Sequence, residues 1–121
     1  MVRIVGVQRS DEVHSEFVLL QNQGSLRANL RGLTLLAARS LGTGQPALYV
    51  FPDDVDVAPG NFVLLKTGPC AEKWCLTRDG QRVFYTGMGH TSPFWSRLPG
   101  EVHLLGIQHT FCERSAEPVL V

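Results

Sequence analysis

Glycine and proline divide this chain into short segments, and their spacing constrains the fold more than any other feature of the sequence. The 121 residues include 12 Gly and 7 Pro, and only two stretches without either residue, 7–23 and 107–117, are longer than ten residues. Helices of globular proteins typically run for about 8–20 residues, whereas strands need only about 4–8. The sequence therefore predicts many short strands joined by turns, which is an all-β fold.

The segments between these breaks are rich in apolar, β-branched and aromatic residues, a composition typical of strands. We expect strands at residues 2–7, 16–20, 33–38, 48–51, 61–65, 82–85, 101–105 and 110–112. Residues 13–21 are ambiguous, because Val13, Phe17 and Leu20 could share one face of a helix. The same region could instead form a turn followed by a buried strand at 17–20, and the surrounding turn spacing favours the strand.

Three dipeptides predict specific turns. Asp79-Gly80 lies between two strand-like segments and predicts a tight hairpin with positive φ at both residues. Pro59-Gly60 and Pro99-Gly100 suit type II turns, because proline presets the first central position and glycine tolerates positive φ at the second. Each of these two turns is followed by an apolar run, so we expect each to lead into a strand.

Composition bounds the class of protein. Hydrophobic residues make up 44% of the chain and charged residues 18%, which excludes intrinsic disorder. Eleven basic residues balance eleven acidic ones. No segment has the roughly 20 apolar residues of a membrane helix, and no secretory leader is visible. We therefore expect one globular domain, 1–121, without membrane insertion.

The order of segments resembles the lamin tail domain, an immunoglobulin-like β-sandwich. An opening strand at 2–7 precedes an apolar strand that ends at Asn22, and a third apolar strand follows a glycine at position 32. Phe51-Pro52, a short spacer, Pro59-Gly60 and an apolar strand then follow in the order typical of the family. The segment 100–105 resembles the family's late strand, which begins with glycine and an acidic residue.

The resemblance implies an immunoglobulin-like β-sandwich of two mostly antiparallel sheets. It also implies a non-catalytic structural or protein-interaction module within a larger protein, located in the nucleus or the cytoplasm. Lamin tail domains bind proteins and sometimes chromatin, and the family supplies no catalytic residues. The sequence agrees, since it contains no phosphate-binding loop, nucleophile elbow or dinucleotide fingerprint. We expect no cofactor and no small-molecule substrate.

The three cysteines allow a different hypothesis. Cys70 and Cys75 are close in sequence, and so are His109 and Cys112. Two such pairs of soft ligands could form a tetrahedral zinc site if the fold brought them together. A disulfide between Cys70 and Cys75 is another alternative. The simplest interpretation is that all three are reduced thiols, with Cys112 packed in a strand.

Aromatic and arginine residues are the candidates for an interaction surface. Trp74, Phe94 and Trp95 lie in segments that we expect to be loops, and large aromatic residues are enriched at binding hot spots, although they also fill cores. Arg27, Arg31 and Arg39 are close in sequence and could form a patch for nucleic acid or chromatin, the alternative function. The balanced net charge argues against a strong basic surface.

The remaining titratable residues favour ordinary structural roles. Asp53, Asp54 and Asp56 follow the strand at 48–51 and are typical of a solvated loop, with weak calcium binding as the alternative. His103 alternates with apolar neighbours and should point to solvent. His90 lies near Ser92, but no carboxylate accompanies them to complete a catalytic triad.

Overall fold

The computed structural model describes residues 1–106, and in these residues the fold is all-β, with three short 3-10 turns. The strands are β1 (Val2–Gln8), β2 (Phe17–Asn22), β3 (Ala28–Asn29), β4 (Thr34–Ala37), β5 (Leu48–Val50), β6 (Asp56–Val57), β7 (Phe62–Lys66), β8 (Lys73–Leu76), β9 (Arg82–Gly87) and β10 (Val102–Leu105). The 3-10 turns are η1 (Val13–Ser15), η2 (Ala38–Ser40) and η3 (Trp95–Arg97). No helix in residues 1–106 has the length and apolar character needed to span a bilayer.

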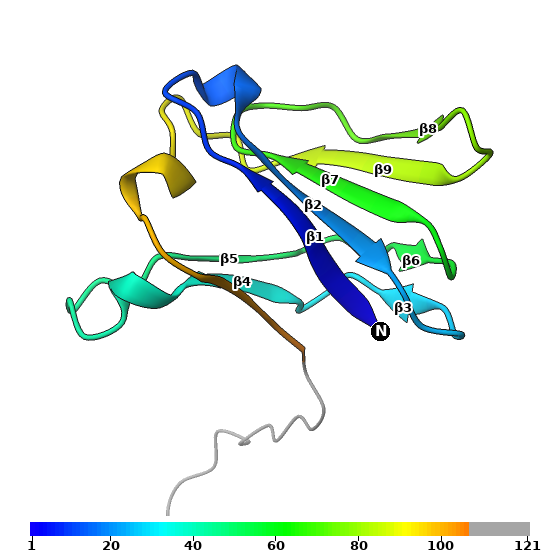
Figure 1. Ribbon diagram of the computed structural model, residues 1–121, viewed down its shortest axis with the longest axis horizontal. Coiled ribbons are helices and arrows are strands. Elements are labelled where there is room, and N and C mark those ends of the chain that lie inside the picture. Colours follow the sequence, from blue (N-terminus) through cyan, green and yellow to red (C-terminus); the bar gives the residue numbers. More distant parts are fainter. Residues whose placement is uncertain (107–121) are drawn as a thin grey trace, which may run out of the picture.

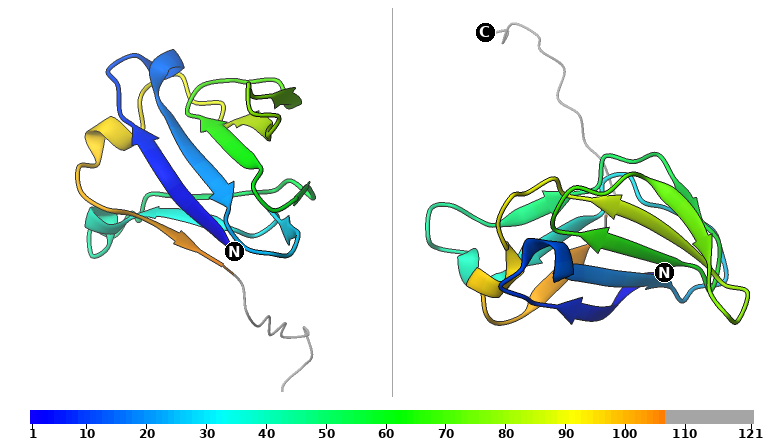
Figure 2. Two further views of the ribbon diagram at one scale, coloured as in Figure 1. Left: turned by 45° about the vertical axis from the view of Figure 1, so that its right-hand side comes forward. Right: turned by 90° about the horizontal axis from the view of Figure 1, so that it is seen from above.

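The strands form a five-stranded sheet in the order β1-β2-β7-β9-β8, a three-stranded sheet in the order β10-β4-β5, and a two-stranded sheet of β3 and β6. The five-stranded sheet forms one layer, and the smaller sheets form the other (Figure 1). Figure 2 shows these layers from two further directions. Strands β7 and β9 pair in parallel, whereas every other strand pair in the described residues is antiparallel. This arrangement is compatible with a β-sandwich.

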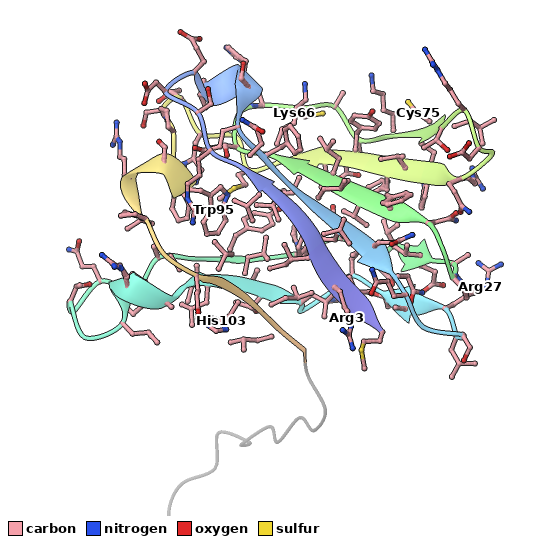
Figure 3. All side chains as sticks on the ribbon, in the orientation of Figure 1. Arg3, Arg27, Lys66, Cys75, Trp95 and His103 are labelled. Atoms are coloured by element: carbon pink, nitrogen blue, oxygen red, sulfur yellow. The ribbon has the colours of Figure 1, made fainter. Side chains whose placement is uncertain are left out.

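The core lies between the two layers and draws on one face of each sheet. Its fully buried members include Val18, Leu20, Val63 and Leu65 from the large sheet, and Leu30, Leu35, Phe51 and Val57 from the opposite layer. Trp95, in η3, is the largest fully buried side chain in the described residues. It points into the space between the sheets (Figure 3). Burying one Val, Leu or Phe side chain completely stabilises a fold by about 1.5–3 kcal/mol.

Most of the predicted strands are confirmed within one or two residues. In the ambiguous region the strand interpretation is correct: η1 forms a single turn, and β2 begins at Phe17. The expected strand at 110–112 lies outside the described residues. Three strands were not expected: β3 and β6 contain no apolar run that marks a strand, and the residues of β8 were expected to lie in a loop.

The three predicted turns differ in outcome, and at Pro99-Gly100 the glycine has the expected positive φ (+110°) and the strand β10 follows. At Pro59-Gly60 the prediction is confirmed, because Gly60 has φ +85° and the N–H of Asn61 donates to the carbonyl of Ala58 (3.1 Å). At Asp79-Gly80 the hairpin forms, but positive φ at both positions is wrong. Only Gly80 has positive φ (+81°), and its N–H donates to the carbonyl of Thr77 (3.1 Å). This is a three-residue loop that ends on a left-handed glycine.

Glu16, which immediately precedes β2, is fully buried and ties three segments together. Its carboxylate accepts hydrogen bonds from the backbone N–H groups of Phe94 and Trp95 (both 2.8 Å), Ser96 (3.0 Å) and Ser10 (3.4 Å), and from the hydroxyl of Thr67 (2.8 Å). Burial raises the pKa of Glu16, but these hydrogen bonds outweigh it, so the pKa lies below its usual range. Glu16 is therefore an ionised anchor for the segment that leads into η3.

Asn22, at the other end of β2, is also fully buried. Its side-chain Nδ2 donates to the carbonyls of Leu26 (2.9 Å) and Val57 (2.8 Å). Its Oδ1 accepts from the N–H of Gly24 (3.0 Å) and from the N-terminal ammonium of Met1 (3.1 Å). All four hydrogen-bonding positions of the amide are used, and they connect the large sheet to β6.

Candidate functional site

The second face of the five-stranded sheet points away from the core and is largely apolar. Strand pairing places Leu19, Leu64 and Tyr85 side by side across β2, β7 and β9. In the next row Phe62 lies beside Val83, and on the other side of the central row Phe17 lies beside Lys66. We call this surface the outer face and define it by six residues: Phe17, Leu19, Phe62, Leu64, Val83 and Tyr85.

The outer face is separate from the core. Its members alternate along each strand with core residues such as Val18, Leu20 and Val63, and none of the six belongs to the core cluster or packs against it. Val83 is buried and the other five are half-buried, because they cover one another on a closely paired sheet. Strands β2, β7 and β9, which carry this surface, are inner strands of the sheet and pair with a neighbour on both sides.

Charge is segregated around this face even though the net charge of the chain is zero. The five strands of the large sheet contain no Asp or Glu, and three of their four basic residues, Arg3, Lys66 and Lys73, lie on the side of the outer face, whereas Arg82 covers Trp74. The ammonium Nζ of Lys73 lies 5.3 Å from the centre of the Tyr85 ring, so this cation stands directly on the outer face. Lys66 pairs across the sheet with Phe17. Lys66 is labelled on the large sheet in Figure 3.

The three predicted aromatic residues separate into different environments. Trp95 is fully buried, so it belongs to the core and the expectation that it contributes to a surface is wrong. Trp74 lies on β8 rather than in a loop, its ring is 5.2 Å from that of Phe84, and the guanidinium of Arg82 covers it at 5.0 Å. Phe94 is half-buried and packs edge-on against Trp95 (4.7 Å).

The three predicted arginines are exposed, but they do not form one patch. Arg27 lies at the end of the molecule that carries β3 and β6 (Figure 3). Arg39 belongs to η2, which lies at the opposite end of the small sheet (Figure 1). Residues that are close in sequence lie apart here, because the extended strand β4 separates Arg31 from Arg39. The expectation of one patch formed by all three arginines is therefore wrong.

The proposed zinc ligands cannot be compared as a set, since His109 and Cys112 lie outside the described residues. Cys70 and Cys75 are both free thiols and half-buried, and the disulfide alternative is not formed. Cys75 lies on β8 and pairs with Val83 at the margin of the outer face. Within residues 1–106, no three His, Cys, Asp or Glu side chains gather as they would around a metal ion.

The acidic residues after β5 lie in the layer opposite the outer face. The side-chain amide of Asn29 donates to Asp54 (2.7 Å) and Asp56 (3.0 Å), which accounts for these two carboxylates as local structure. A hydrogen bond with Asp53 raises the pKa of exposed Glu72. Burial raises the pKa of Tyr49 to about 12, and the charges of the same two carboxylates add to the effect.

The histidines have structural contacts. His103 is exposed, as predicted, and its Nε2 lies 3.2 Å from a carboxylate oxygen of Glu101. The ring of His90 stacks on Phe94 at 5.2 Å. Neither arrangement supplies a nucleophile with a positioned base.

The sequence contained a signal for the outer face. The segments 17–20 and 62–65 are apolar at every position, whereas a strand with one solvated face normally alternates. In a fold of only two layers, continuous apolar strands leave one apolar face uncovered.

Comparisons with family models, curated proteins and solved structures found no match for this chain.

Proposed function

We propose that this chain is a non-catalytic protein-interaction module that binds a protein partner through the outer face. The observation that carries the proposal is the continuous apolar surface of Phe17, Leu19, Phe62, Leu64 and Tyr85 on the solvent side of the large sheet. Contiguous apolar surfaces of soluble domains are typical of interaction sites.

Two physical features support binding here. The outer face includes three aromatic rings, and large aromatic residues contribute much of the energy at protein interfaces. These side chains stand on paired strands and already cover one another, so binding would order few additional groups. A low ordering cost leaves more of the contact energy available as affinity.

We further propose that the topology is immunoglobulin-like and that the chain is related to lamin tail domains. The support is the order of the sequence segments, in which Phe51-Pro52 and Pro59-Gly60 precede the apolar strand β7. A two-layer all-β arrangement is compatible with this proposal. Lamin tails serve as docking domains, which agrees with a binding role for the outer face.

The proposed function is tested by selecting binders from a displayed library of random peptides. Leu64 occupies the middle of the central row, so Leu64→Glu places a carboxylate at the centre of the outer face. We expect this variant to bind the selected peptides at least about tenfold more weakly, because a charge would be buried without a partner. Fluorescence anisotropy with labelled peptides measures the change.

A matched control comes from the same sheet. Leu76→Glu introduces the same substitution on β8, where Leu76 is 73% exposed and lies in register with Arg82 rather than with the outer-face residues. We expect it to leave binding unchanged, and circular dichroism checks that both variants are folded. Failure to select any binder, or binders equally weakened by both substitutions, would contradict the proposed function.

A further inference from the structure

We infer that the protein partner of the outer face is acidic and presents carboxylates around an apolar centre. This inference rests on the proposed function and adds the chemistry of the partner. The starting observation is the complete absence of Asp and Glu from the five strands of the large sheet, which carry Arg3, Lys66 and Lys73 on the side of the outer face. In a chain with equal numbers of acidic and basic residues, that distribution is a strong local imbalance.

The positions of two lysines connect this imbalance to the outer face. Lys73 lies opposite Tyr85 at the end of the row that contains Leu19 and Leu64, with its ammonium over the Tyr85 ring. Lys66 ends β7 and lies between Phe17 of β2 and Gly87 of β9. The apolar centre is thus bounded by cations on two sides, and exposed Arg3, on the edge strand β1, is in register with Gln21.

Charge argues against a second copy of this chain as the occupant. Two outer faces brought together would place the lysines of both copies against the same small interface. Like charges facing each other across an interface cost several kcal/mol and select against that pairing. Carboxylates on a different partner would instead pair with the same lysines.

Shape argues against a lipid surface. A segment that inserts into a bilayer buries its apolar side chains about 5–10 Å into the boundary between headgroups and acyl chains. The apolar side chains of the outer face are half-buried on a paired sheet and do not project as a wedge. Such a surface fits a flat protein segment better than a membrane.

The test repeats the peptide selection with reversed charge. We expect peptides selected by the native chain to contain at least about twice the library frequency of Asp and Glu next to apolar residues. The double variant Lys66→Glu, Lys73→Glu should select peptides enriched in Lys and Arg instead. A control double variant, Arg27→Glu with Arg97→Glu, makes the same change in net charge at two exposed arginines off the outer face and should keep the native preference.

Two further measurements sharpen the result. Raising NaCl from about 50 to 300 mM should lower the affinity of the acidic peptides and leave the affinity of uncharged peptides unchanged, since salt screens exposed charges. Flotation with phosphatidylserine vesicles tests the lipid alternative directly. Vesicle binding that depends on Lys66 and Lys73, without acidic peptides in the selection, would overturn the inference in favour of a membrane.

The inference and the proposed function fail in different ways. Binders that are sensitive to Leu64→Glu but show no acidic enrichment, or no change of preference on charge reversal, would overturn the acidic partner and leave the interaction module standing. Selection of no binders at all would contradict both the acidic partner and the proposed function. Acidic enrichment that reverses with the lysine charges supports the inference.

Discussion

The two ends of β2 are both fixed by a fully buried polar side chain, but the two side chains use opposite chemistry. Glu16 only accepts hydrogen bonds, and all of its partners are N–H or O–H groups. Asn22 both donates and accepts, and its donated bonds go to two carbonyls. The difference shows that the same strand depends on a charge at one end and on a neutral amide at the other.

Neither residue can be replaced by its isosteric counterpart without a mismatch. Glutamine at position 16 would turn an NH₂ group toward donors, and aspartate at position 22 would turn an oxygen toward carbonyls. A buried group without a complementary partner loses its hydration without compensation. The predictions below use this contrast between a charged acceptor and a neutral amide, and they start with the largest effect.

The largest effect is expected for Asn22→Asp. The new carboxylate would lie fully buried against the carbonyls of Leu26 and Val57, and it would have lost both donated bonds. We expect the free energy of unfolding at pH 7 to fall by about 3 kcal/mol, because one oxygen would face two carbonyls and the Met1 ammonium on the other oxygen offsets the buried charge only in part. Urea denaturation followed by circular dichroism measures this free energy. A loss below about 1 kcal/mol would contradict the stabilising role of the two bonds that Asn22 donates.

A smaller effect is expected for Glu16→Gln. One oxygen remains to accept bonds from Phe94 or Trp95, but the NH₂ group opposes at least one other donor. We expect a loss of about 2 kcal/mol in the free energy of unfolding. Glu12→Gln is the matched control, because Glu12 is exposed and its side chain is not an anchor. Equal stability of the two variants would contradict the role of Glu16.

The smallest effect is expected from acid alone, because protonation leaves the Glu16 side chain in place. The pKa of Glu16 is lower in the folded state than its ordinary value of 4.5. The ionised side chain therefore stabilises the fold fully above pH 4.5, and this stabilisation is lost as the pH falls through the pKa of the folded state. The stability gap between the native chain and Glu16→Gln should therefore narrow below about pH 4.5. Urea midpoints measured from pH 7 to about pH 3 test this.

The Asn22→Asp variant should behave in the opposite sense. Its buried carboxylate would have a raised folded pKa, so its penalty is largest at neutral pH and decreases as acid protonates it. A protonated carboxyl could donate to one of the two carbonyls. If both variants showed parallel pH profiles, the assignment of a charged and a neutral end to β2 would be wrong.

Much of the fold could be predicted from the sequence, because breaks and apolar runs are local signals. The turn at Pro59-Gly60 and the strand after Asp79-Gly80 follow from residue types that adopt only a few conformations. The conformation of Asp79 could not be predicted, since a dipeptide does not fix the length of its loop. Strands β3 and β6 are defined only by pairing with each other, which no local pattern records.

The candidate site was harder to predict, because it depends on which strands become neighbours. Trp74, Phe94 and Trp95 were chosen for their type, yet the surface is formed by residues such as Leu19, Leu64 and Tyr85 that become neighbours only by strand pairing. The Glu16 anchor also gave no signal, since three of its partners are backbone N–H groups about eighty residues away.

The pairing of β2 with β7 has a consequence for how the chain folds. Leu20 meets Val63, which lies roughly forty residues later, so a long loop must close before the centre of the large sheet exists. Proteins dominated by such distant pairings typically fold in milliseconds to seconds. During synthesis, the hairpin of β1 and β2 would emerge first and remain without its neighbour until β7 leaves the ribosome. Until then, the apolar residues on both sides of β2 would remain exposed to solvent.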